Sequence, residues 1–124
     1  MKKKSFKITC SLQEGYGQDG RLFTFGDAER VIANWLEDRL NNNLPLVNGM
    51  LQQGSLIFQA PEKVTEKVLI SPTIVFEGEL SSKKDMQRND NEVNDTLRSL
   101  ALHLKEQLKQ ESVFVIYLNE HWCV

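Results

Sequence analysis

The sequence has little of the chemistry that marks secreted or membrane proteins. Its 124 residues include two cysteines, Cys10 and Cys123, which are too few for a disulfide framework. No apolar run approaches the ~20 residues that span a bilayer. The lysines at positions 2–4 precede an alternating stretch and not the apolar segment of a secretory signal. We therefore expect a cytoplasmic protein with reduced thiols and no membrane partner.

The chain also lacks an excess of positive charge. Its 15 lysines and arginines are outnumbered by 17 aspartates and glutamates, which gives a net charge of −2. Nucleic-acid-binding proteins usually carry a basic patch, because contacts to phosphates supply much of their affinity. A sheet that stacks RNA bases would also need exposed aromatic side chains, whereas the outward residues of the first predicted strand are Lys7, Thr9 and Ser11. The sequence therefore predicts no nucleic-acid partner.

Four segments have the pattern of β-strands. Phe6, Ile8, Cys10 and Leu12 alternate with polar residues, the two-residue period of a strand with one buried face. The other three predicted strands are residues 56–60, 68–80 and 113–118.

Two segments have the apolar stripe of an amphipathic helix, residues 28–40 and 93–108. Thr24 or Asp27 can cap the first helix, and a residue within 89–91 can cap the second. The polar stretch 81–91 before the second helix is predicted to be a mobile linker.

The resulting order of elements is β-α-β-β-α-β within a single α+β domain of residues 1–124. This order is typical of a ferredoxin-like sandwich, an antiparallel sheet with two helices on one face. Folds of this kind host many unrelated functions, so the fold by itself names no activity.

The last predicted strand is apolar on both faces. Val113, Val115 and Tyr117 point one way and the residues between them the other. A strand of this kind normally has both faces buried. We expect a homodimer that covers the sheet, with Val113, Val115 and Tyr117 at the interface. The alternative is that the chain covers the sheet itself, with residues 13–25, 44–54 or the tail at Trp122.

A glycine-rich segment spans residues 15–20 and matches G-x-G-x-x-G. In a dinucleotide site this motif opens a helix, but the residues after Gly20 have an extended pattern. We therefore interpret the segment as a turn and expect no cofactor. Tyr16, Asp19 and Arg21 lie in this loop and are the candidate binding residues, because recognition often lies on loops.

Three residues are candidates for catalysis. His121 is able to transfer a proton near neutral pH, and Glu77 could orient it if the two lie within hydrogen-bonding distance. Glu77 and Glu79 are two apart on a strand and share a face, but no third ligand completes a metal site. Tyr16 is the third candidate.

No catalytic motif is complete, and apolar residues are left over on the sheet. The sequence therefore favours a non-catalytic binding or assembly module that forms a homodimer through its sheet. The alternative is a small enzyme or metabolite-binding domain with His121 and Glu77 in a pocket.

Overall fold

A computed structural model describes residues 4–16, 20–62, 65–118 and 120–124 of the chain. Along the chain the elements are β1 (Lys4–Ser11), the short 3-10 helix η1 (Glu14–Tyr16), α1 (Phe25–Asn41), β2 (Met50–Gln59), β3 (Val68–Leu80), α2 (Lys83–Met86), α3 (Asp90–Gln107), β4 (Phe114–Tyr117) and β5 (Glu120–Cys123).

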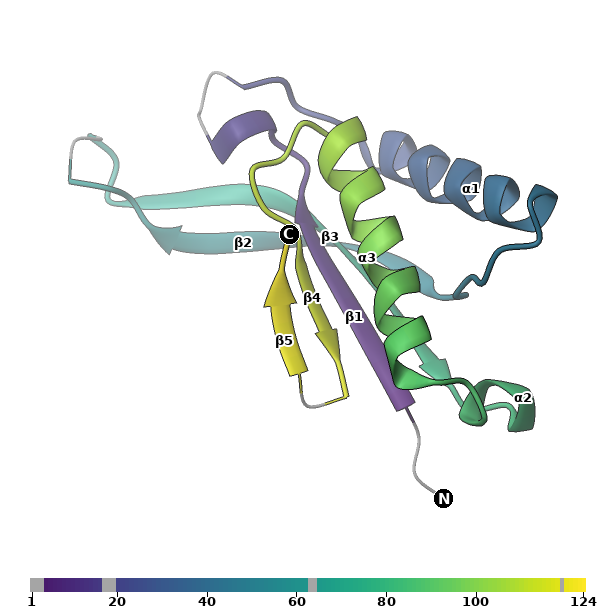
Figure 1. The fold of residues 1–124 in the computed structure, drawn as a ribbon. Coiled ribbons are helices and arrows are strands. Elements are labelled where there is room, and N and C mark those ends of the chain that lie inside the picture. Colours follow the sequence, from purple (N-terminus) through teal and green to yellow (C-terminus); the bar gives the residue numbers. More distant parts are fainter. Residues whose placement is uncertain (1–3, 17–19, 63–64, 119) are drawn as a thin grey trace.

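The sheet is antiparallel, with strand order β2-β3-β1-β4-β5. Its first four strands have the order of a ferredoxin-like sandwich, and the long helices α1 and α3 lie on one face (Figure 1). This confirms the predicted fold class. The hairpin partner β5 was not predicted, because we interpreted residues 120–124 as a tail.

The core lies between the sheet and the two long helices. From β1 it takes the predicted residues Phe6, Ile8 and Cys10, and burial raises the pKa of the Cys10 thiol to about 12. The predicted cap of α1 is a capping box: Asp27 N donates to Thr24 Oγ1, and Thr24 N donates to Asp27 Oδ2. These two bonds satisfy donors that the first helical turn leaves without a partner.

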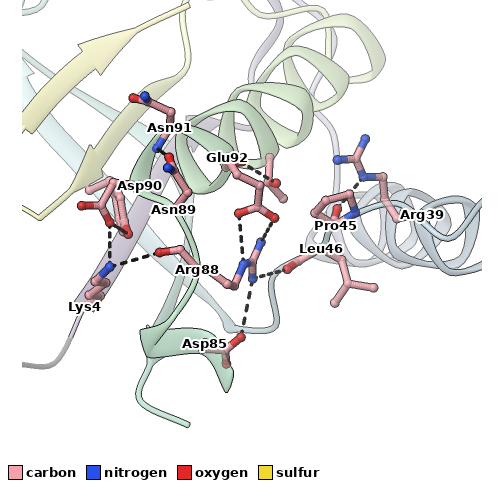
Figure 2. Close-up of polar contacts among 12 residues, drawn as sticks. Lys4, Arg39, Pro45, Leu46, Asp85, Arg88, Asn89, Asp90, Asn91 and Glu92 are labelled. Carbon is pink, nitrogen blue, oxygen red and sulfur yellow. Dashed lines mark hydrogen bonds and ion pairs between the residues drawn. The ribbon is translucent and has the colours of Figure 1, made fainter. Parts of the chain in front are cut away.

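The segment 81–91, expected to be a mobile linker, contains helix α2 and a turn. The turn is tied down by Arg88, whose guanidinium bonds both carboxylate oxygens of Glu92 and the carbonyl of Leu46 (Figure 2). The Nη1 atom of Arg88 also lies 3.6 Å from Asp85 Oδ1. These contacts join the turn to α2, α3 and the loop before β2.

The two faces of β4 correct the expected interface. Val113, Val115 and Tyr117 are fully buried in the chain's own core, so their side chains are not available to a second copy. The helix-free side instead presents Phe114, which is 53% exposed, and Ile116, which is half-buried. Both sets are apolar, and the alternation alone did not indicate which set faces the helices.

The far end of the β2–β3 hairpin extends beyond β1. Pairing between β1 and β3 ends at Ser11↔Thr73, while β2 and β3 stay paired as far as Gln59↔Val68. We call residues 56–59 and 68–71 the arm; Figure 1 shows it projecting from the body of the sheet. Large apolar side chains of the arm are exposed, Ile57 at 64% and Ile70 at 67%.

Candidate functional site

One row of residues crosses four strands on the helix-free face, and the backbone register continues into β5. The register pairs Glu77 with Met50 of β2 and with Lys7 of β1, pairs Lys7 with Ile116 of β4, and pairs Ile116 with position 121 of β5. Paired residues share a face of the sheet. Residues from distant parts of the sequence therefore become neighbours.

A shallow, open depression of about 550 Å³ lies along part of this row. It is lined by Ser5, Phe6, Lys7, Met50, Gln52, Glu77, Gly78, Glu79 and Ile116. Phe6 belongs to the core, whereas Lys7, Glu77, Glu79 and Ile116 alternate with core residues and so face away from the helices. The depression combines two carboxylates and one ammonium with the apolar side chains of Met50 and Ile116.

Gly78 lies between the two carboxylates of the depression and faces the core. A Cβ at this position would lie 2.8 Å from the Phe6 ring and would also meet the backbone oxygen of Asn48. Since real Cβ atoms do not come this close, the packing requires glycine here. The close approach holds β3 against the core while Glu77 and Glu79 extend from the opposite face.

Figure 2 shows a polar cluster around Lys4 and Asp90. Lys4 is at the same end of β1 as the depression, and by the alternation along the strand its side chain is on the opposite face from Lys7. Asp90 Oδ1 accepts a 2.7 Å hydrogen bond from the Tyr117 hydroxyl and a 2.8 Å bond from Lys4 Nζ. The bonds from Lys4 and then Tyr117 lower the pKa of Asp90. Burial, followed by the bond to Asp90, raises the pKa of Tyr117. The cluster ties the start of α3 to β1 and β4, so its role is to hold these elements together.

The predicted pair of Glu77 and His121 is separated by two strands. Position 121 lies on β5, and β4 and β1 intervene before β3, so the two backbones are about 14 Å apart at the usual strand spacing. Lys7 and Ile116 occupy the row between them. Glu77 lines the depression, and the side chain of His121 lies outside the described residues.

The described part of the predicted binding loop lies away from the depression. Arg21 is exposed, with its guanidinium 4.6 Å from the centre of the Phe23 ring. Arg21 precedes Leu22, which forms a β-bridge with Gln13 just after the end of β1. Gln13 is six residues beyond Lys7, about 20 Å along an extended chain. The backbone of Tyr16 ends η1, but its side chain lies outside the described residues, as does the whole of Asp19.

Met50 and Gln52 were missed as site residues, because the predicted strand begins at residue 56 whereas β2 begins at Met50. Glutamines and Gly54 have low strand propensity, but pairing with β3 overrides it. In the structure Met50 pairs with Glu77. No sequence pattern within residues 50–55 indicates that this segment is a strand or that it pairs with β3 in this register.

Residues 4–16, 20–62, 65–118 and 120–124 contain neither a cluster of metal-ligating side chains nor a membrane-spanning helix. No three His, Cys, Asp or Glu side chains in those ranges gather closely enough to bind a metal ion. No helix within them is both long and apolar enough to cross a bilayer.

No protein-family model matches the sequence, and no curated protein matches it. Among solved structures, the fold is similar to that of phage SAM lyase. The complex of that enzyme with S-methyl-5'-thioadenosine is 15% identical, with a TM-score of 0.68 over 98% of this chain and 88% of the lyase chain. The apo enzyme is 16% identical, with a TM-score of 0.69 over 98% and 87% of the two chains.

This likeness corrects the functional interpretation made from the sequence. The expectation of a non-catalytic binding module is overturned, because the structures that share this fold along nearly their full length are those of an enzyme. The finding favours the alternative, a small enzyme or metabolite-binding domain. At 15–16% identity what is shared is the fold.

Proposed function

We propose that the chain is an enzyme that cleaves S-adenosylmethionine (SAM), as a lyase. The observation that carries the proposal is the fold shared with phage SAM lyase over 98% of this chain and 88% of the lyase chain. S-Methyl-5'-thioadenosine, which that lyase holds in one structure, is the thioether left when SAM loses its four-carbon amino-acid chain. Because one fold can carry many activities, the proposal also needs a site with suitable chemistry.

The depression on the helix-free face is the site that we assign to this reaction. Cleavage breaks the bond between the sulfonium sulfur and the amino-acid chain, and the electron pair of that bond stays on sulfur. The carbon left behind takes an electron pair from the same substrate, either from the substrate's carboxylate or from a C–H bond whose proton goes to a base. Glu77 is half-buried in the depression. It serves as that base in the second route, and in both routes its negative charge attracts the cationic substrate.

The test is incubation of the purified chain with SAM, followed by mass spectrometry of the products. We expect S-methyl-5'-thioadenosine to form faster than in SAM without protein, and the mass of the four-carbon product to distinguish the two routes. Glu77→Gln should lower the rate by about 10²-fold or more if the carboxylate is the base. Glu37→Gln, an exposed change on α1, is the matched control and should leave the rate unchanged. No product above the protein-free reaction would refute the proposed function.

We also propose that the chain forms a homodimer through the edge of its sheet. β2 is an edge strand, and the arm that it shares with β3 exposes apolar side chains. Phe114 and Met50 stay more than half exposed, so the described parts of the chain do not cover the helix-free face at these two positions. Two copies of an edge strand can pair antiparallel about a twofold axis, which satisfies backbone groups and shields the arm in one step.

The cytoplasm is the compartment that we propose. Cys10 is buried and Cys123 exposed, and both are free thiols. An exposed thiol without a disulfide partner suits a reducing compartment.

A further inference from the structure

The charges of the depression have a defined arrangement. Lys7 and Glu77 are direct cross-strand partners, and Glu79 follows two residues along β3 on the same face. Cross-strand Cβ atoms lie about 5 Å apart, and same-face neighbours along a strand about 7 Å apart. Two negative charges and one positive charge are therefore close together, and the rest of the lining has no formal charge.

This arrangement is the complement of SAM itself. SAM carries two positive groups, the sulfonium and the α-ammonium, and one negative group, the carboxylate. Resting on the proposed function, we infer that the depression selects its ligand by charge: Glu77 and Glu79 attract the two cations, Lys7 binds the carboxylate, and the neutral thioether is held weakly.

Cleavage changes the charge of the ligand in the depression and so affects turnover. When the carbon–sulfur bond breaks, its electron pair neutralises the sulfonium, and S-methyl-5'-thioadenosine carries none of the three charges. The attraction between this thioether and the carboxylates is therefore lost at the chemical step, so the thioether is held more weakly than SAM and leaves the depression free for the next SAM. Attraction that is strongest in the ground state does not by itself accelerate cleavage. The charges therefore act on affinity and selectivity, separately from any role of Glu77 as a base.

A purely structural role for these charges makes a different prediction. A cross-strand pair of Lys7 and Glu77 would stabilise the sheet by a small amount, as exposed ion pairs do. Removing Glu77 would then change the unfolding midpoint without changing which ligand binds. Ligand selectivity therefore separates the two roles.

The experiment measures equilibrium binding by calorimetry with three probes. Sinefungin carries an ammonium in place of the sulfonium and has no bond to cleave, S-adenosylhomocysteine carries a neutral sulfur on the same amino-acid chain, and S-methyl-5'-thioadenosine has no amino-acid chain. We expect the wild-type protein to bind sinefungin on the order of tenfold more tightly than S-adenosylhomocysteine, because the additional ammonium of sinefungin is attracted to Glu77 and Glu79. Water near the surface screens this attraction only in part. The preference should shrink as salt is raised.

The variants assign the preference to residues. Glu77→Gln should remove most of the preference, and the control Glu37→Gln should retain it. Lys7→Met should weaken the binding of sinefungin and S-adenosylhomocysteine, which both have a carboxylate, and leave the affinity for S-methyl-5'-thioadenosine unchanged. Thermal unfolding of each variant establishes that it is folded.

The outcomes separate this inference from the proposed function. Equal affinities for the charged and neutral probes, an intact preference in Glu77→Gln, or no binding of any probe would overturn the inference. Cleavage of SAM without the preference would overturn the inference and leave the proposed function standing. The preference without cleavage would support charge recognition and refute the proposed function.

Discussion

Tyr117 is fully buried, and its hydroxyl finds a partner in Asp90 at the edge of the core. A buried hydroxyl without a hydrogen bond is costly, so Asp90 must accept this bond while it also accepts one from Lys4. Asp90 is half exposed, so water screens its charge and its ionic contribution to stability is small. One carboxylate oxygen thus joins β4, β1 and the first turn of α3.

We predict that Asp90→Asn lowers stability at neutral pH and that the loss shrinks in acid. Above pH 3.8, the ordinary pKa of the group, the carboxylate is charged in both states and its folded-state bonds stabilise the protein. The pKa of Asp90 is lowered in the folded protein, so as the pH falls through 3.8 the unfolded chain takes up a proton before the folded protein does. The stabilisation that the Asp90 carboxylate gives the folded protein is then lost.

Urea unfolding of the wild-type protein and Asp90→Asn at a series of pH values measures the difference. Asp95→Asn, an exposed change on the same helix, is the control. The difference in unfolding free energy between this variant and the wild-type protein should not shrink in acid. A difference that grows in acid would contradict the assigned role of Asp90.

Helix α1 begins at a capping box that the sequence already indicates. Thr24 Oγ1 and the Asp27 carboxylate each accept a backbone N–H at the first turn. The bond from the Thr24 N–H is the largest cause of the lowered pKa of Asp27. The box sets where the helix starts, and its buried face of Ala28, Ile32 and Trp35 then packs on the sheet.

Thr24→Ala should therefore lower the free energy of unfolding by about 1 kcal/mol, the usual cost of losing an N-cap side chain. Thr24→Ser retains the oxygen and should cost far less. Chemical denaturation measures both. If the serine and alanine variants lose the same amount, the methyl group of Thr24 and not the cap is responsible.

The arm is a second element whose behaviour follows from its composition. Ile57 and Ile70 are cross-strand partners and each is about two-thirds exposed. Exposed apolar strands at a sheet edge tend to pair with other chains. The arm projects from the body of the sheet (Figure 1), and the described parts of the chain leave Ile57 and Ile70 largely uncovered.

Considered as a whole, the molecule has one well-covered face and one open face. Helices shield the first, and the proposed dimer shields the arm at the edge of the second. We predict that the wild-type chain elutes as a dimer at micromolar concentration and that the double variant Ile57→Lys, Ile70→Lys elutes as a monomer, because four lysines would meet in the paired arms.

Light scattering coupled to gel filtration measures the mass. Leu102→Lys, a change at an exposed leucine on α3, is the control and should remain dimeric. A wild-type chain that stays monomeric at high micromolar concentration would refute the dimer.

Local patterns in the sequence were enough to predict the two long helices, the first strand and the order in which the first four strands and these helices follow one another. The alternation of Phe6, Ile8 and Cys10 and the cap at Thr24 each depend on residues close together in the chain. Burial of one face and satisfaction of the first helical turn are short-range requirements. The fold class could therefore be predicted.

Tertiary structure decided which residues form the candidate site. Lys7, Met50, Glu77 and Ile116 come from four strands, and only the pairing register brings them into one row. The sequence also left open which apolar face of β4 meets the helices, because both faces offer similar hydrophobic free energy. Burial of Val115 and Tyr117 is the outcome of packing against α3. Contacts between residues far apart in sequence depend on the whole fold, and no local pattern encodes them.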